Sequence, residues 1–362
     1  MLRRILVLIF VTLISSTSTA QTISVRYKGK QIVGKPVFWN DYTVKVMERD
    51  GKVSEFPPNQ VKDYKVLSKD FKLFSYGELK AKLEREFGKT FNVTGTGQYL
   101  VVHPAGQSDL WANRFEELYR SMLHYYRVRQ ISVSSSPLPF IAIVFPTRGM
   151  YESYSAKVLG NSASGTLGFY SGETNRIYLF DSTNGSRNAS WQTNAETIVH
   201  EAAHQTAFNI GVHRRFAGTP RWVIEGIGTL FEAPGVYDGQ RYPEQKQRIN
   251  HEQLRNFTNS VDDTNATETI KNIIVSDKLF SRSQTKAYAT AWAITFYATE
   301  TRPKEYARYI KLLYRRKAFS SVSASERLRD FRTAFGDASR FVPQMLSYYR
   351  SLDTTTKQVS TQ

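Results

Sequence analysis

The chain has 362 residues, no cysteine, 41% hydrophobic residues and a formal net charge of +17 at pH 7. The lack of cysteine excludes disulfides, thiolate metal ligands, a cysteine nucleophile and a lipoprotein anchor. This hydrophobic content can build one large domain or two unequal ones, and the excess of positive charge favours anionic partners such as cell-envelope polymers. No nucleic-acid-binding motif accompanies the charge, so we expect no specific recognition of nucleic acid.

The first 20 residues have the three-part pattern of a secretory signal peptide. Arg3 and Arg4 precede an apolar run over residues 5–14, and the small residues Ser18 and Ala20 then mark a cleavage site. The run is too short to span a bilayer, and no other stretch approaches the roughly 20 apolar residues that a spanning helix needs. We therefore expect an exported protein, located in the periplasm, in the cell envelope or outside the cell, that does not span the membrane.

Residues 21–67 predict a small β-module of SH3-like size. Apolar and polar residues alternate there in short runs, and Asp50–Gly51 has the composition of a hairpin turn. Residues 68–90 contain helical spacing and predict a helical linker. No catalytic grouping occurs in the module, so the chemistry is expected in the rest of the chain.

Residues 91–352 predict an α+β domain in which a small mixed sheet precedes a helical half. Strand-like runs surround a long predicted helix over residues 109–127, and the chain after Thr193 has helical patterns throughout. The strand-like runs are 91–102, 140–145, 166–170 and 176–180. The polar residues 353–362 predict a disordered tail.

An H-E-x-x-H sequence carries the candidate chemistry. The capping box Thr193–Glu196 and the apolar residues after it predict that the motif lies on a helix. His200 and His204 are four residues apart and project from one face of that helix, so both imidazoles can bind one zinc ion. Glu201 lies near the same ion, where its carboxylate can take a proton from a bound water and act as a general base.

The third ligand separates the classes of zinc site. The metzincin pattern requires a histidine six residues after His204, but that position is Ile210. Glu225 is the better candidate, because Thr219 predicts an N-cap, Pro220 the first helical position, and residues 221–232 the second helix that follows. A carboxylate on that helix can complete a His, His, Glu set and leave one position open for water.

These residues resemble the gluzincin metallopeptidases, whose pattern is H-E-x-x-H followed by W-x-x-E-G. Trp222 to Gly226 match the second part, and the chain is most similar to the bacterial peptidase MA-like family, a domain of unknown function, over residues 138–300. Gly228 stands where these proteins usually have alanine, a departure that we expect to matter little. Gly226 and Gly228 also allow the two predicted helices to pack closely.

The gluzincin resemblance implies a role for each residue of the set. His200, His204 and Glu225 would bind one zinc ion per chain, and Glu201 would serve as general base and acid. Gluzincins also use a downstream tyrosine or histidine to stabilise the oxyanion that forms during hydrolysis. Tyr288 is the candidate here, and a packing aromatic is the alternative at this position.

Three further polar residues lie near the motif. Glu232 either accepts a hydrogen bond from a zinc-binding histidine or faces solvent. His213 follows Gly211 in a loop and is expected at the surface rather than at the metal. Glu196 already has a local role in the predicted capping box, so no catalytic role is assigned to it.

The favoured function is that of an exported zinc metallopeptidase. It would hydrolyse peptide or protein substrates with a zinc-activated water, and Glu201 would be the general base and acid. The gluzincin resemblance implies an edge strand beside the zinc helix, with which a substrate could pair as an added strand, and residues 165–170 or 177–180 are the candidates for it.

The alternative function is that of a catalytically inactive, peptidase-like scaffold that binds anionic cell-envelope components. A cationic stripe recurs at helical spacing late in the chain, although a solvated helix face is the favoured explanation for it. The stripe consists of Lys304, Arg308, Lys311 and Arg315. The intact set of ligands and base favours the enzyme over the scaffold.

Overall fold

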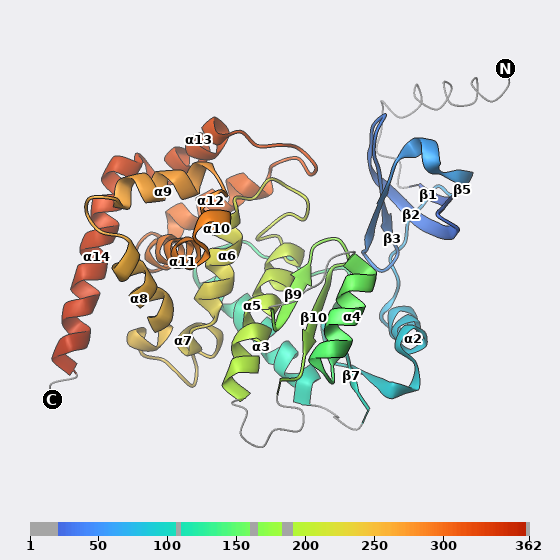
Figure 1. The fold of residues 1–362 in the computed structure, drawn as a ribbon, viewed down its shortest axis with the longest axis horizontal. Helices are drawn as coiled ribbons and strands as arrows, with labels where there is room; N and C mark the ends of the chain where they lie inside the picture. The colour runs from blue at the N-terminus through green and yellow to red at the C-terminus, as the bar shows by residue number, and fades with distance from the viewer. Residues whose placement is uncertain (1–20, 106–109, 160–165, 183–190, 360–362) are drawn as a thin grey trace. The chain divides into compact units, whose positions relative to one another are not determined.

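The computed structural model describes residues 21–105, 110–159, 166–182 and 191–359 (Figure 1). The chain divides into two compact units, and the boundary between them falls between Leu79 and Lys80. The predicted signal peptide, residues 1–20, lies outside the described residues. No helix in the described part of the chain is long and apolar enough to cross a membrane.

The first unit is an antiparallel sheet of five strands. The strands are β1 (Thr22–Tyr27), β2 (Lys30–Trp39), β3 (Val44–Glu48), β4 (Val53–Phe56) and β5 (Lys62–Ser68), in the order β4-β3-β2-β1-β5. The predicted turn joins β3 to β4, where Gly51 has a φ of 83° and donates its N–H to the Glu48 carbonyl. The core of this unit is small and contains Ile23, Val25, Ile32, Val44, Val46 and Phe56.

Helix α2 (Tyr76–Phe87) contains the boundary between the two units and lies within the predicted helical linker. The second unit then begins with a mixed sheet of β6 (Phe91–Gly95), β7 (Tyr99–Pro104), β8 (Phe140–Phe145), β9 (Gly168–Ser171) and β10 (Arg176–Phe180). The strand order is β6-β7-β8-β10-β9, and β7, β8 and β10 are parallel. The sequence predicts one strand over residues 91–102, but a turn after Gly95 divides this segment into an antiparallel pair.

Helices cover both faces of the mixed sheet. Helices α3 (Leu110–Val128) and α5 (Trp191–Asn209) lie on one side, and α4 (Arg148–Leu159), which was not predicted, lies on the other (Figure 1). The double cover explains why every residue of β8 is buried and apolar rather than alternating. Strand β9 is at the edge of the sheet, next to α5.

Of the two segments predicted as an exposed sheet edge, one lies at the edge and the other does not. Residues 168–171 form the edge strand β9, and residues 160–165 lie outside the described residues. Residues 177–180 belong to β10, which pairs with β8 on one side and β9 on the other. No backbone edge of β10 is left for a substrate to pair with.

The rest of the described chain is helical, as predicted. The α-helices are α6 (Arg221–Phe231), α7 (Pro234–Tyr237), α8 (His251–Ser260), α9 (Ala266–Val275), α10 (Leu279–Arg282), α11 (Gln284–Thr301), α12 (Pro303–Tyr314), α13 (Ala324–Phe335) and α14 (Ala338–Val359). The fold of this unit is α+β, with the mixed sheet first and the helices after it. Helix α14 continues past residue 352, where the sequence predicts a disordered tail.

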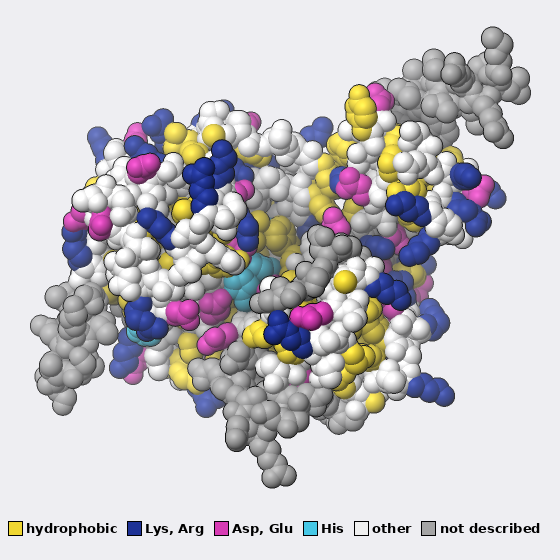
Figure 2. All heavy atoms as spheres, viewed as in Figure 1, with side chains coloured by type: hydrophobic (Ala, Val, Ile, Leu, Met, Phe, Trp, Pro, Cys, Tyr) yellow, Lys and Arg dark blue, Asp and Glu magenta, His cyan; other side chains and the backbone are white. Residues whose placement is uncertain are grey.

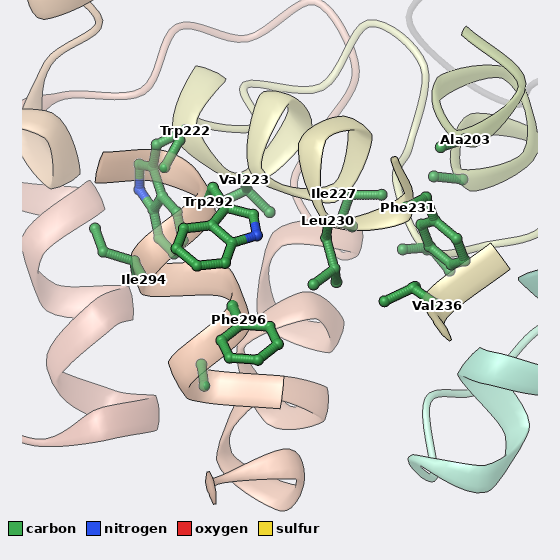
Figure 3. Close-up of a cluster of buried hydrophobic side chains, with 14 of the residues drawn as sticks. Ala203, Trp222, Val223, Ile227, Leu230, Phe231, Val236, Trp292, Ile294 and Phe296 are labelled. Carbon is green, nitrogen blue, oxygen red and sulfur yellow. The ribbon is translucent and has the colours of Figure 1, made fainter. Parts of the chain in front are cut away.

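Helices α6 and α11 form the centre of the core (Figure 3). Trp222, Leu230 and Trp292 are fully buried between them and their neighbours. The helices approach closely because Gly226 has no side chain, and a Cβ there would lie 2.2 Å from Thr295 Oγ1. Gly226 thus allows α6 to pack closely against α11. The sequence predicted instead that this glycine allows close packing against the helix of the H-E-x-x-H motif, α5.

Two predicted helix starts differ from the structure. Helix α5 begins at Trp191, so the residues of the predicted capping box lie inside its first turns rather than before them. Helix α6 begins at Arg221, and Pro220 occupies the N-cap position with an extended backbone instead of the first helical position. Neither shift moves the candidate site residues off their helices.

Candidate metal centre

Three side chains from two neighbouring helices converge on one point. His200 and His204 come from α5, and Glu225 comes from α6, which packs against α5. The Nε2 atoms of the two histidines are 3.0 Å apart, and Glu225 Oε2 lies 3.4 Å from the first and 3.5 Å from the second. Figure 2 shows histidine side chains reaching the surface beside acidic ones on the face in view.

These distances fit a single zinc ion. Ligand atoms bound to zinc at about 2.05 Å in a tetrahedron lie about 3.3 Å from one another. The three observed separations are close to that value. Two imidazole nitrogens and a carboxylate oxygen are also the donor set that catalytic zinc sites use, with a fourth position for water.

Glu232 sets the tautomer of His200. Its Oε1 lies 2.7 Å from His200 Nδ1, so this nitrogen carries the proton and leaves the lone pair on Nε2, which faces the cluster. Asn250 fixes the carboxylate in turn, since its side-chain amide donates to Glu232 Oε2 at 2.7 Å and to the Thr229 carbonyl at 3.1 Å. Of the two alternatives for Glu232, the structure has the contact with a histidine.

The electrostatics of the cluster favour a positive charge within it. Burial disfavours the charged imidazole of His200, but hydrogen bonds to Glu225 and Glu232 raise its pKa well above the usual value. Burial also disfavours the carboxylate of Glu225, yet hydrogen bonds from His200 and His204 hold its pKa well below the usual range. Because the site stabilises an added proton, it also suits a bound cation.

Gly228 makes room for the first histidine. A Cβ at this position would lie 2.5 Å from His200 Cε1 and 2.7 Å from Nε2, closer than carbon atoms approach one another. An alanine at this position would therefore require the His200 ring to shift, so the departure from the usual residue affects how this ring is placed. Here the missing Cβ is the space into which the imidazole fits.

Glu201 is held by the edge strand of the sheet. The backbone N–H of Tyr170 in β9 donates to Glu201 Oε2 at 2.6 Å, which leaves Oε1 free of this contact. The strand therefore aims the carboxylate that follows His200 in the motif. While this bond is present, a substrate strand cannot use the Tyr170 N–H.

Tyr288 lies beside the cluster, as expected for the residue proposed to stabilise an oxyanion. Its ring centroid is 6.4 Å from that of His200. Burial raises the pKa of Tyr288 to about 12, and the neighbouring Glu225 carboxylate acts in the same direction. The phenol thus keeps its proton at neutral pH and can donate a hydrogen bond.

Two expectations for neighbouring residues are wrong. His213, expected at the surface, is 1% exposed and packs against Phe208, with ring centroids 5.2 Å apart. It is absent from the cluster of possible metal ligands. Glu196 lies within the length of α5 rather than at its N-terminal cap. Partial burial, together with the charges of Glu232 and Glu252, raises the pKa of its carboxyl.

Three contributors to the site were not predicted. Arg221 binds Glu225, Asn250 binds Glu232, and the Tyr170 backbone binds Glu201. Arg221 could have been found, because it lies four residues before Glu225 on the same helix face. Asn250 and Tyr170 come from distant parts of the chain, and no local pattern indicates their contacts.

The fold and the cluster define the class: an α+β protein with a His, His, Glu set that could hold a metal ion, in the order along the chain that gluzincins use. A protein family described as a protein of unknown function, DUF1570, matches residues 194–320, less than half of the chain and the part that contains the cluster. None of the curated proteins matches the chain.

Among solved structures, the chain is similar to the crystal structure of a mutant M1 zinc metallopeptidase from Deinococcus radiodurans. The TM-score is 0.37 and the sequence identity is 14%, over 70% of this chain and 49% of that one. The chain therefore spans about half the length of the metallopeptidase that it matches.

Proposed function

We propose that this chain is a zinc-dependent peptidase that acts outside the cytoplasm. The observation that carries the proposal is the convergence of His200 Nε2, His204 Nε2 and Glu225 Oε2 at separations of 3.0 to 3.5 Å. Export is supported by the signal-peptide pattern of residues 1–20.

Each residue of the site has a task in such a reaction. A zinc ion held by the three ligands would lower the pKa of a bound water to about 7 and polarise the substrate carbonyl. Glu201, oriented through Oε2 by the Tyr170 N–H, accepts the proton of the attacking water on Oε1 and transfers it to the leaving nitrogen. The phenol of Tyr288 donates to the oxyanion of the tetrahedral intermediate.

Replacing the base tests this proposal directly. Glu201→Gln keeps the size of the side chain and its contact with the Tyr170 N–H, but it cannot accept the proton. We expect kcat for peptide hydrolysis to fall about a thousandfold while one zinc ion per chain is retained. The matched control is Glu252→Gln, which neutralises an exposed carboxylate on α8 and should leave kcat unchanged. An unchanged kcat in Glu201→Gln would remove Glu201 from the mechanism.

A second candidate function is the binding of anionic envelope polymers. A cavity of about 1230 Å³ in the second unit is lined by more arginines than carboxylates, and none of the three candidate ligands lines it. Its arginines are Arg114, Arg120, Arg129, Arg241 and Arg248, and its carboxylates are Glu117 and Asp238. Arg129 and Arg248 both pair with Glu300, and Arg120 pairs with Glu116, so the excess of positive charge in the lining is modest. That excess favours phosphate-bearing or carboxylate-bearing chains.

Retention on an anionic resin separates this function from general surface charge. A variant in which Arg120 and Arg241 are neutralised should elute at lower salt than a variant in which Lys304 and Arg308 are neutralised. The side chains of Lys304 and Arg308 belong to the cationic stripe and are exposed on α12. Equal shifts would mean that the cavity contributes only net charge.

A further inference from the structure

The two oxygens of Glu225 have different surroundings. Oε2 faces the two histidines, at 3.4 Å from His200 Nε2 and 3.5 Å from His204 Nε2. Oε1 instead lies 3.1 Å from the Nε atom of Arg221. The Glu225 side chain is 11% exposed, and the Tyr288 hydroxyl also interacts with both Glu225 and Arg221.

Arg221 is itself fixed in place. It is the first residue of α6, four residues before Glu225, and its backbone N–H donates to Asp277 Oδ1 at 3.1 Å. Its guanidinium lies 4.6 Å from the ring centroid of Phe280, in the range of a cation–π contact. Asp277 is held in turn by two hydrogen bonds from Arg327, at 2.7 and 2.9 Å. Segments that contribute no ligands therefore hold both the Arg221 backbone, through Asp277, and its side chain, through Phe280.

We propose that Arg221 is a positioning residue that restricts Glu225 to a single ligand oxygen at the metal centre. A glutamate can bind a metal through one oxygen or through both. With Oε1 engaged by the guanidinium, only Oε2 is directed at the cluster. Three protein atoms would then hold the ion and leave the fourth position for water, as catalysis by a zinc-bound water requires. This inference rests on the proposed metal centre, and it adds the residue that sets the coordination number.

The alternative is that Arg221 and Glu225 form an ordinary ion pair along a helix. Pairs of this kind contribute little when one partner is exposed, and the Arg221 side chain is 44% exposed. In that case, removal of the guanidinium would change zinc affinity by no more than about threefold and would not alter the coordination geometry.

The test uses the purified full-length mature protein with Co²⁺ as a spectroscopic probe and Zn²⁺ in competition. Arg221→Met retains much of the length and the apolar contact with Phe280 but cannot bind Oε1. We expect its Zn²⁺ dissociation constant to rise about 10- to 100-fold, and the visible absorption of bound Co²⁺ to weaken as Glu225 becomes bidentate and the coordination number rises. Arg221→Lys, which keeps a charged donor, should restore part of both properties.

Arg282→Met is the matched control, because it removes an exposed arginine from the neighbouring helix α10. Wild-type affinity and a wild-type Co²⁺ spectrum in Arg221→Met would overturn the inference. If Arg221→Met does not fold, Arg221→Lys decides the question. Its ammonium group lacks the planar fork of the guanidinium, so we expect a partial loss of Zn²⁺ affinity and a partial weakening of the Co²⁺ absorption, and wild-type values of both would overturn the inference. If the wild type binds neither Co²⁺ nor Zn²⁺, the proposed function itself fails, which is a separate result.

Discussion

Two histidines of the second unit, one half-buried and one buried, have opposite acid–base behaviour. His200 has carboxylates on both sides, and although burial acts against the charged ring, they raise its pKa well above the usual value. His213 is more enclosed, at 1% exposed against 14% for the His200 side chain, and neither of its ring nitrogens hydrogen-bonds to a side chain among the described residues. Burial, with a smaller contribution from His204, lowers the pKa of His213 to about 3. The partners, rather than the residue type or the burial, decide whether a buried imidazole attracts a cation.

The largest expected effect comes from removing the carboxylate that faces both candidate zinc-binding histidines. Glu225→Ala leaves two nitrogen ligands, and we expect zinc affinity to fall at least about a hundredfold, more than the loss of an outer partner causes. Competition with a chromophoric chelator measures this change. Glu252→Ala is the control. A zinc affinity of Glu225→Ala within about threefold of the wild-type value would show that Glu225 is not the third ligand.

A smaller effect is expected from Glu232→Ala, which makes His200 more like His213. The change removes the acceptor at His200 Nδ1, so we expect zinc affinity to fall about 10- to 100-fold. In the metal-free protein the pKa of His200 should also decrease, which can be followed by NMR titration of the ring. A pKa that stays as high as in the wild type would show that Glu225 alone accounts for the shift.

The smallest effect concerns His213 and appears only as the pH falls. Its folded pKa is about 3 and lies below the unfolded value of about 6.5, so the unfolded state binds the proton first and stability is lost as the pH falls below 6.5. Between pH 7 and pH 5 this one group should lower the free energy of unfolding by about 2 kcal/mol. His213→Leu should remove that loss in urea unfolding at the two pH values.

The exposed His251 provides the control for this measurement. His251→Leu should leave the difference between pH 7 and pH 5 as it is in the wild type. If His213→Leu shows the wild-type difference as well, His213 is protonated as easily in the folded protein as in the unfolded chain.

Local patterns predict the parts of the site that lie on single helices. The four-residue spacing of His200 and His204 requires only that the segment be helical, and the structure places both on α5. Glu225 is likewise predicted from the start of its own helix. The start of α5 was predicted incorrectly, because helix ends depend on contacts outside the motif as well as on capping residues.

Contacts between distant segments could not be predicted. The sequence places His213 in a polar loop, and only the packing against Phe208 shows that the ring is buried. The contact between Gly228 and His200 could not be predicted either, because the atoms that a Cβ at Gly228 would clash with belong to a residue on another helix. For the same reason, the choice between residues 168–171 and 177–180 as the sheet edge required the strand order.

The sequence by itself determined the chemical groups of the candidate site: two imidazoles one helical turn apart, a carboxylate between them and a second carboxylate on the following helix. Those features depend on helical periodicity, which acts over a few residues. The tertiary structure decided how the donors are aimed, through Arg221 on Glu225, Asn250 on Glu232 and the Tyr170 backbone on Glu201. Orientation depends on which helices and strands pack together, and that is a property of the whole unit rather than of any segment in it.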